Sequence, residues 1–554
     1  MILNRTDYVR KAEAFLSGRE FVQLEEDPTK SFQTYVQTTL RNMKNKFGEK
    51  LYRKLYPSSS RPGLYFGLGK MHKLKDDSRN VGELPLRPVI SNIGTATYEL
   101  SKHLAEILKP LTKSEYSIDS TKDFVTKIRN ENIPEGYELV SFDVVSLFTK
   151  VPLDYTIELI LNKIYREKMV KTKLKRKEMK TLLQICTKEM HFSFNGVIYR
   201  QVDGVAMGSP LGPVLANVFM VQLEKTLVPQ LESSIALWYR YVDDTFTIIQ
   251  EGKVEEVLER LNSFHDSIKF TYEKGKEGVI SFLDVKVITK ANRTFDTDIY
   301  RKQTDTNIYM NWKSFAPKEW KIGTLKGLIR RAFVICSNEQ FLNKEISFLK
   351  NVFGKINGFP SRVIHDTIRS VKLKIEHEVS PPEVNPPEEE TVPEVTRSTD
   401  EVVKPFICLP YKGKEGEKIL SQFRSALTKA LPSHVQPQFT YKGKKIGSYF
   451  RLKDKVSIEH QSGLVYVFKK GKYVGETKVR FGDRIDQHCH TDKKSAVYKF
   501  KVENQVQVSK DDFEILDMGY SNTLNRKLAE ALFIKDIKPE LNEQVKSYKL
   551  NLFN

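Results

Sequence analysis

Two adjacent carboxylates form the most informative pattern in this 554-residue chain. Tyr241-Val242-Asp243-Asp244 lies between Leu237–Tyr239 and Phe246–Ile249, two runs whose aromatic and β-branched residues predict the strands of a β-hairpin. Like charges at a tight turn repel each other unless a cation lies between them. Magnesium binds oxygen ligands and keeps positions open for substrate phosphates, so this hairpin tip is a candidate metal site for phosphoryl transfer.

A third carboxylate lies farther upstream, in the nearly apolar run Leu139–Phe148. Burying an unpaired carboxylate costs several kcal/mol, so we expect Asp143 to lie at a strand end, to pair with a cation, or to bind metal. Between the two acidic segments, Gly204–Pro213 is rich in small and turn-forming residues and precedes a helical pattern through Phe219. Such glycines allow a backbone to approach a ligand closely.

In this order the three segments resemble the catalytic motifs of a reverse transcriptase. Further segments resemble the fingers and thumb signatures of one branch, the Penelope-like retroelements, which are related to telomerase reverse transcriptases. The resemblance covers most of residues 1–375 and implies a right-hand polymerase of fingers, palm and thumb. The motifs are Ser141-Phe142-Asp143, Ala206–Pro210 and Tyr241–Asp244, and the signatures are Gly67–Lys73, Pro85–Ser91 and Tyr300–Thr304.

The resemblance implies a two-metal polymerase site. Asp143 and Asp243 would hold two Mg²⁺ ions, for which Mn²⁺ could substitute, and Asp244 would support them. Catalysis at such a site consists of positioning and of charge stabilisation.

Four other residues match positions that handle the incoming nucleotide. Lys70 and Arg87 are similar to the side chains that grip the triphosphate, as a point charge and as a bidentate guanidinium. Phe148 matches the bulky residue that excludes a ribose 2′-hydroxyl, although a core aromatic is an equally open interpretation. Lys269 is a candidate for protonating the leaving pyrophosphate, with a plain surface lysine as the alternative.

The C-terminal part carries a second ordered set of polar residues. Leu464–Phe468 and Tyr473–Thr477 predict a hairpin with one tyrosine on each strand. Arg484 and His488 follow at helical i, i+4 spacing and therefore share a face. A predicted helix, Arg526–Leu532, then contains Glu530 and precedes Asn542.

This order resembles a GIY-YIG endonuclease over residues 456–554. The resemblance implies that Glu530 ligates one divalent ion and that Arg484 stabilises the charge of the pentacovalent phosphate. Tyr466 or Tyr473 would orient or deprotonate the attacking water, and His488 would assist proton transfer. Asn542 would stabilise the fold of the site.

The chain departs from the family pattern in two ways. The first tyrosine motif reads Leu-Val-Tyr, with its glycine displaced to Gly463, which leaves the strand register open. Residues 467–472 contain no cysteine and residues 495–508 no histidine, whereas many animal members of the resembled family carry both at these places, as expected of a zinc site. His488-Cys489-His490 is too compact for a tetrahedral site, so no structural zinc is predicted.

Composition sets the boundaries. Residues 376–401 contain nine acidic residues, one arginine and five prolines, which predicts a flexible, extended linker. We therefore expect a multidomain α+β protein in which this linker joins the polymerase to a small α/β endonuclease. The predicted domains are 1–135 (N-terminal segment and fingers), 136–290 (palm, with a basic insertion at 163–180), 291–375 (thumb), 376–403 (linker), 404–455 (connector) and 456–554 (endonuclease).

Charge and hydropathy indicate the partners. The net charge of +20 predicts a polyanionic partner, because cationic side chains release counterions from nucleic-acid phosphates. The basic run Lys171–Lys180 is interpreted as a solvated helix face or a phosphate contact ahead of a nuclear-import signal. No apolar run of about 18 residues and no signal peptide are found, which predicts a soluble intracellular chain without a membrane partner. Four dispersed cysteines suggest reduced thiols.

The combined expectation is target-primed reverse transcription by a retrotransposon protein. The endonuclease would cut double-stranded chromosomal DNA, and the polymerase would extend the released 3′-hydroxyl with deoxynucleoside triphosphates along the element's RNA. The expected location is the nucleus, at chromatin, after cytoplasmic synthesis. Two alternatives stay open: a telomerase-like reverse transcriptase that extends existing DNA ends with an inactive nuclease domain, and a non-enzymatic RNA-binding protein.

Overall fold

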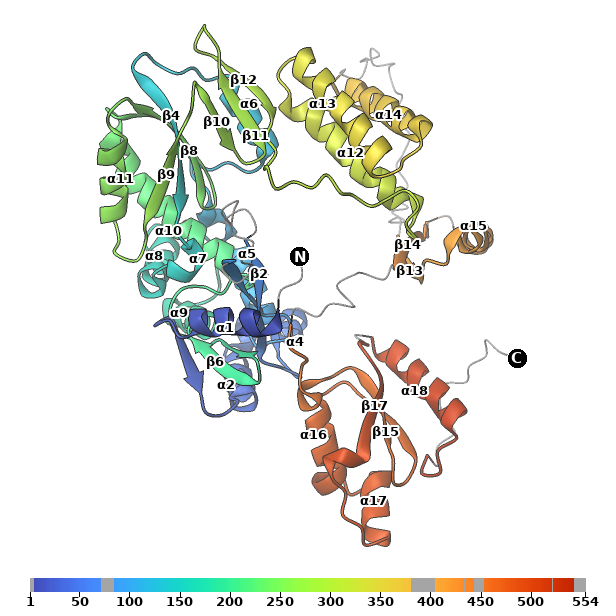
Figure 1. Ribbon diagram of the computed structural model, residues 1–554. Coiled ribbons are helices and arrows are strands. Elements are labelled where there is room, and N and C mark those ends of the chain that lie inside the picture. The colour runs from blue at the N-terminus through green and yellow to red at the C-terminus, as the bar shows by residue number, and fades with distance from the viewer. Residues whose placement is uncertain are drawn as a thin grey trace, which may run out of the picture.

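The computed structural model describes residues 4–70, 84–379, 404–432, 434–442, 453–520 and 522–542 (Figure 1). Residues 71–73 of one expected fingers signature lie outside these ranges, as do residues 380–403 of the predicted linker. The first four residues assigned to the linker belong to helix α14 (Ser361–Val379), so the helical region extends beyond the predicted boundary at residue 375.

The region expected to form the fingers contains a five-stranded sheet in the order β1-β6-β5-β2-β3. Its aromatic core includes Tyr65, Phe192 and Phe194, which pack beneath α1 (Arg5–Leu16). The strands are β1 (Phe21–Leu24), β2 (Gly63–Gly69), β3 (Leu86–Ser91), β5 (His191–Phe194) and β6 (Val197–Gln201). Strands β5 and β6 come from residues 136–290, the range predicted to form the palm. The five-stranded sheet therefore spans the boundary predicted at residue 135.

The region expected to form the palm contains a four-stranded antiparallel sheet in the order β7-β8-β4-β9. The predicted hairpin is confirmed. One face of the sheet packs on helices, and the expected helix after the glycine-rich loop is confirmed as α10. The elements are β4 (Tyr137–Val144), β7 (Ile235–Tyr241), β8 (Asp244–Gln250), β9 (Phe270–Lys274), α5 (Tyr98–Leu108), α8 (Leu153–Tyr165), α9 (Arg176–Thr187) and α10 (Gly212–Leu227).

Strand β4 ends earlier than the apolar run that predicted it. Ser146 adopts a left-handed conformation with φ 55°, and helix α7 (Leu147–Lys150) follows at once. The extended run was therefore a wrong prediction beyond Val144. Asp143 consequently lies near the end of the strand, and its side chain is exposed. This confirms one of the three alternatives expected for it, the position at a strand end.

A buried ion pair joins the palm sheet to α10. Arg240 is 1% exposed and Glu224 is 0% exposed, and Arg240 Nη2 donates to Glu224 Oε2 at 3.0 Å. The indole of Trp238 also donates to this carboxylate, at 3.1 Å. Arg240 Nη1 donates to the Val242 carbonyl at 3.1 Å, so the pair restrains the turn that bears Asp243.

Replacing Glu224 by alanine should destabilise the palm by about 3–5 kcal/mol, because it leaves a buried guanidinium unpaired. The measurement is the hydrogen-exchange protection of the β7 and β8 amides, which reports local stability in a multidomain chain. Glu232→Ala, which removes an exposed carboxylate just beyond the same helix, is the control and should leave the protection unchanged. Equal protection in the two variants would contradict the stabilising role of the pair.

A three-stranded sheet and a helical bundle follow the palm. The sheet runs in the order β10-β11-β12 and continues to Ile299, nine residues past the predicted palm boundary at 290. The bundle packs around Leu325, Ile329 and Phe353. The elements are β10 (Val279–Phe282), β11 (Val285–Thr289), β12 (Phe295–Ile299), α12 (Lys318–Ile335), α13 (Glu339–Asn351) and α14.

The connector contains a small β-α-β unit, for which the sequence offered no motif. Strands β13 (Phe406–Pro410) and β14 (Gln438–Lys442) are parallel, and α15 (Gly413–Ala430) connects them. Rings of this unit contact the segment before α12, since the Tyr411 and Phe315 centroids are 5.0 Å apart.

The C-terminal domain is a three-stranded sheet, β16-β15-β17, with helices on both faces. Helices α16 and α17 cover one face and α18 covers the other, as the orange and red ribbons in Figure 1 indicate. The predicted hairpin is confirmed with the expected bounds, and the predicted helix is confirmed but longer. The elements are β15 (Leu464–Phe468), β16 (Tyr473–Thr477), β17 (Phe513–Met518), α16 (Phe481–Asp486), α17 (Ala496–Glu503) and α18 (Thr523–Ile537).

The C-terminal domain contacts the fingers. The Asn195 amide donates to Asp454 Oδ2 at 2.6 Å, and Lys30 Nζ lies 3.7 Å from Asp483 Oδ1. Across the same boundary, His460 Nε2 lies 3.4 Å from Asp27 Oδ2. The described structure therefore has the C-terminal domain in direct contact with the region that contains the five-stranded sheet (Figure 1).

The cysteines form no disulfide, and the described helices were compared with the length and apolarity that a membrane span needs. The four cysteines are unbridged, with Cys408 exposed and the other three buried. Burial raises the pKa of Cys186 to about 12, which keeps that thiol protonated. Among the described helices, none is both long enough and apolar enough to cross a bilayer.

Candidate active sites

Three aspartates meet at one end of the palm sheet. Asp143 faces Asp244 across the β4–β8 register, and Asp243 lies in the turn between β7 and β8. The turn is closed by Val242 with φ 60° and by a bond from the Val144 amide to the Asp243 carbonyl at 3.3 Å. Sheet pairing thus brings Asp143 beside two adjacent carboxylates that are far from it in the sequence.

The electrostatics of this site favour a bound cation. Desolvation, followed by the negative charges of Asp243 and Asp143, raises the pKa of Asp244 to about 6, although its side chain retains contact with solvent; Lys302 opposes the rise. No three acidic, histidine or cysteine side chains among the described residues form a ready-made metal cage. Mg²⁺ does not need such a cage, because it usually binds one or two carboxylates and completes its coordination with water and substrate phosphates, so a magnesium site at these aspartates stays a prediction.

The expected triphosphate-binding residues lie on the neighbouring fingers strands. The Lys70 amide donates to the Pro85 carbonyl at 2.8 Å, just past the end of β2. Arg87 lies on β3 opposite Leu68, and its side chain is exposed. The two cations therefore come from adjacent strands of one sheet.

The glycine-rich loop joins those strands to the palm. The Ile90 amide donates to the Met207 carbonyl at 2.8 Å, and Gly208 has φ 125°. A Cβ on Gly208 would lie 2.3 Å from the Ile90 carbonyl oxygen, so only glycine permits this approach. The loop thus fixes the fingers strand β3 against the polymerase site.

Phe148 and Lys269 occupy different kinds of position. Phe148 lies on α7, is half-buried, and accepts a bond from the Val205 amide through its carbonyl at 2.7 Å. Lys269 is exposed, and its ammonium donates to the Asn262 carbonyl at 2.9 Å. Protonation of a leaving group by Lys269 would require the side chain to leave that carbonyl.

In the C-terminal domain, the residues of the expected nuclease converge on one tyrosine oxygen. Tyr466 is fully buried, its hydroxyl lies 2.6 Å from His488 Nε2, and Arg484 Nε donates to it at 3.2 Å. The Tyr473 ring is 5.8 Å from the His488 ring, centroid to centroid. Burial raises the pKa of Tyr466, whereas burial and then the Arg484 charge lower the pKa of His488 to about 3.

Glu530 is held beside a second carboxylate. Desolvation, followed by the charge of Glu476, raises the pKa of Glu530 to about 7, although the backbone of Glu476 hydrogen-bonds to it and opposes the rise. Arg526, which is 2% exposed, forms an ion pair with Glu476. Sequence reasoning missed Glu476 and Arg526. The i, i+4 spacing of Arg526 and Glu530 was the available signal, but nothing local pointed to Glu476.

This pKa predicts that metal binding at Glu530 depends on pH. Below pH 7 the carboxyl holds a proton that a divalent ion must displace, so Mn²⁺ affinity should fall about fivefold between pH 7 and pH 6. The measurement is calorimetric titration of the Asp243→Ala chain, in which the polymerase site is weakened, with Glu530→Ala as the blank. An affinity that does not change over this range would contradict the raised pKa.

The structure gives the register of the first tyrosine strand, the conformation of the displaced Gly463 and the backbone contacts of Asn542. Tyr466 pairs with Gly475, where a Cβ would lie 2.6 Å from the Tyr466 hydroxyl oxygen. Gly463 adopts φ 64° and lies just before β15. Asn542 binds both polar groups of the Val474 backbone, at 2.9 and 2.8 Å, and so extends the edge of the sheet.

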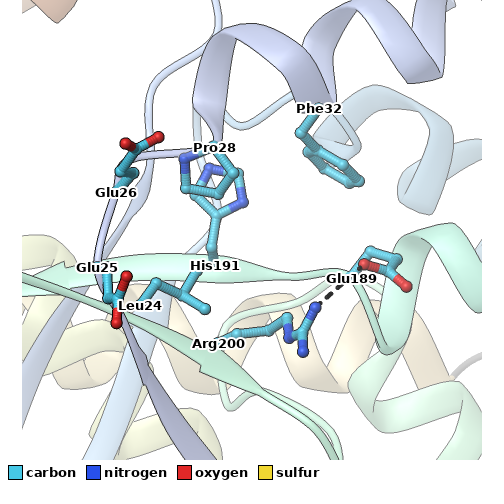
Figure 2. Close-up of a pocket in the computed structure, with 8 residues that line it drawn as sticks. All are labelled: Leu24, Glu25, Glu26, Pro28, Phe32, Glu189, His191 and Arg200. Carbon is cyan, nitrogen blue, oxygen red and sulfur yellow. Dashed lines mark ion pairs between the residues drawn. The ribbon is translucent and has the colours of Figure 1, made fainter.

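A pocket of about 360 Å³ in the fingers contains none of the expected site residues (Figure 2). Glu25, Glu26 and Glu189 give it an acidic lining, and Arg200 pairs with Glu189 at 3.8 Å. His191 is buried there and contacts Thr29 Oγ1 at 2.9 Å. Three carboxylates against one guanidinium make this pocket a poor place for a nucleic-acid phosphate.

Comparisons with known proteins divide the chain. Residues 84–292 match the family model of the reverse transcriptase (RNA-dependent DNA polymerase), and residues 308–369 match the animal helix-turn-helix domain. The first range contains all three aspartates and the second covers α12, α13 and part of α14; residues 453–542 lie outside both. No curated protein matches the chain.

Among solved structures, the chain is similar to yeast telomerases. For Candida albicans telomerase in complex with a TWJ fragment of telomeric RNA, the identity is 11%, the TM-score 0.40, and the match covers 64% of this chain and 66% of that one. For apo Candida tropicalis telomerase truncated of its C-terminal domain, the identity is 12% and the TM-score 0.36, and the match covers 52% of this chain and 59% of that one. For apo Candida tropicalis telomerase without that truncation, the identity is 12% and the TM-score 0.34, and the match covers 64% of this chain and 70% of that one. The chain thus spans just under two thirds of the first of these proteins.

Proposed function

Because this chain contains a reverse transcriptase domain, we propose that it copies RNA into DNA at the site formed by Asp143, Asp243 and Asp244. The observation that supports the proposal most strongly is the register of β4 and β8, which joins the carboxylates within the matched range. Magnesium bound there would lower the pKa of a primer 3′-hydroxyl and neutralise triphosphate charge. Arg87 and Lys70 would orient the triphosphate, and Phe148 would exclude a ribose 2′-hydroxyl.

The C-terminal domain supplies the second half of the proposal, a DNA endonuclease of the GIY-YIG type. The supporting observation is the convergence of His488 and Arg484 on the hydroxyl of Tyr466, whose pKa is raised mainly by burial and to a lesser extent by neighbouring groups that include Glu530. Glu530 would hold one Mg²⁺, Arg484 would offset the charge that develops on phosphate, and Tyr466 or Tyr473 would orient the attacking water.

Together the two sites suit target-primed reverse transcription by a Penelope-like retroelement protein. The nuclease would cut chromosomal DNA in the nucleus, and the released 3′-hydroxyl would prime synthesis on the element's RNA. A net charge of +20 favours the binding of both nucleic acids. The helix-turn-helix match at residues 308–369 is a further candidate for contact with DNA.

The test combines both activities in one tube. The purified chain is incubated with its own encoding RNA, supercoiled DNA, Mg²⁺ and labelled deoxynucleotides, and the product is label covalently joined to nicked DNA. We expect joined product that is lost in both Asp243→Ala and Glu530→Ala. Extension of an added primer without nicking would favour a telomerase-like polymerase that uses existing ends, and the absence of any extension would favour a non-enzymatic RNA-binding protein.

A further inference from the structure

A basic pocket of about 450 Å³ is lined by residues of α3 (Lys44–Phe47), α4 (Glu49–Leu55), α5 and the segment that precedes α9. Three lysines line it, Lys46, Lys171 and Lys173, whereas no carboxylate of the described residues does. The basic pocket therefore differs from the acidic pocket of Figure 2, and its charge suits an anionic ligand.

The structure divides the basic run Lys171–Lys180 into two parts. Helix α9 begins only at Arg176, so the first lysines of the run do not lie on a helix face. Within the helix, two cations of the run already pair with Glu158. Lys171 and Lys173 are exposed and form no ion pair with a described residue, so their charge remains for a ligand.

The segment that carries Lys171 and Lys173 is anchored to the protein. Leu174 is 5% exposed and packs in the palm core, and the Tyr165 hydroxyl donates to its carbonyl at 2.7 Å. The Leu174 amide donates to Thr172 Oγ1 at 3.2 Å, which fixes the turn between the two lysines. Cations held on an anchored segment lose less conformational freedom on binding than cations on a free loop.

Two rings form an aromatic side of the basic pocket. Phe47 and His103 meet edge to face, with centroids 6.1 Å apart and an interplanar angle of 74°, and Phe47 also packs against the palm core. Desolvation and the charge of Lys54 lower the pKa of His103, while Glu106 opposes them, so the imidazole is neutral at pH 7. Neutral rings beside lysines are the surfaces on which unpaired bases stack.

We propose that the basic pocket binds a nucleotide of single-stranded RNA, with Lys171 and Lys173 on the flanking phosphates and the base against Phe47 or His103. The proposal rests on the reverse transcriptase function proposed above, which brings single-stranded RNA to this chain. A duplex keeps its bases stacked inside, so its phosphates would reach the lysines but its bases would not reach the rings. None of the lining residues is a predicted polymerase-site residue, so the RNA held here lies outside the segment that is being copied.

Cross-linking locates the base directly. The full-length chain is irradiated with an oligouridylate of about 12 nucleotides that carries one 5-iodouridine, a length within the range that one single-strand site occupies. The cross-linked peptides are identified by mass spectrometry. We expect cross-links at Phe47 or His103 and their loss in the double variant Lys171→Ala/Lys173→Ala. Cross-links that spare both rings, or that persist in this variant, would overturn the proposal.

The matched control removes two exposed lysines from the helices that border the basic pocket without lining it. Lys50→Ala/Lys177→Ala has the same net charge as the pocket variant and should keep the cross-links. Loss of the cross-links in both double variants would show that general charge, and not the pocket lysines, recruits the RNA, and would overturn the proposal.

Affinity measurements separate the contributions of charge and stacking. Lys171→Ala/Lys173→Ala should make the dependence of log affinity on log salt less steep by about 1.4, because two contacts to single-strand phosphates contribute about 0.7 each. Phe47→Leu keeps an apolar side chain but no ring, and should weaken oligouridylate binding about fivefold or more, whereas Phe47→Tyr should bind normally. An equal weakening of duplex RNA binding by Phe47→Leu would exclude base stacking and overturn the proposal.

A parallel assay distinguishes failure of this proposal from failure of the proposed polymerase. The wild-type chain is given an annealed primer-template whose RNA ends a few nucleotides past the primer. Normal extension without cross-links at the two rings would refute the RNA site alone. Cross-links at the rings in a chain that never extends the primer would refute the polymerase and leave the RNA site in place.

Discussion

Alanine at Asp243 should abolish RNA-directed DNA synthesis, with a loss on the order of 10³-fold or more in primer extension. The residue lies in the turn between β7 and β8, and its backbone carbonyl is tied to the Val144 amide. Removing its carboxylate takes away oxygen ligands without altering the strand register that positions Asp143 and Asp244. The measurement is incorporation of labelled deoxynucleotides on an annealed RNA–DNA primer-template.

The matched control is Asp266→Ala, an exposed aspartate elsewhere in the palm, which should extend at the wild-type rate. Nicking of supercoiled DNA should also persist in the Asp243 variant, because the nuclease residues belong to another domain. If Asp243→Ala extended the primer at the wild-type rate, the polymerase site could not lie at this end of the sheet.

Alanine at Glu530 should have the second large effect, a loss of DNA nicking on the order of 10³-fold or more, with extension of a pre-nicked substrate unchanged. We expect this variant to stay folded. Desolvation and the charge of Glu476 both disfavour the ionised carboxyl, which offsets the loss of its hydrogen bond with the Glu476 backbone, so the thermal stability of the C-terminal domain should change little. Nicking and thermal unfolding are therefore measured on the same preparation.

Glu540→Ala is the control, because this carboxylate is exposed and forms only a surface ion pair with Lys472. It should nick DNA normally. Glu530→Gln, which keeps the shape but not the charge, should be as inactive as the alanine variant. Activity in Glu530→Gln would mean that the residue acts through hydrogen bonding instead of metal ligation.

Local patterns in the sequence were sufficient for the hairpins and helices that carry the candidate site residues. Short runs of apolar, β-branched and aromatic residues around Tyr466 and Tyr473 predicted both strands with their observed bounds, because each strand is short and lies between turn residues. The hairpin that bears Asp243 was predicted for the same reason, although it is longer than expected. For the run containing Asp143, the predicted end of the strand was wrong, because an apolar pattern does not show that Ser146 adopts a left-handed conformation.

Pairing between distant segments was decided by tertiary structure alone. Strands β5 and β6 lie between β1 and β2 in the five-stranded sheet, because a strand hydrogen-bonds to whichever backbone lies beside it and composition carries no record of that partner. The same limit applies to side chains. Glu476 and Arg526 become partners only when β16 and α18 pack together. The sequence by itself therefore determined which residues could do chemistry, whereas the fold decided which neighbours set their protonation and orientation, since those neighbours are brought close only by long-range packing.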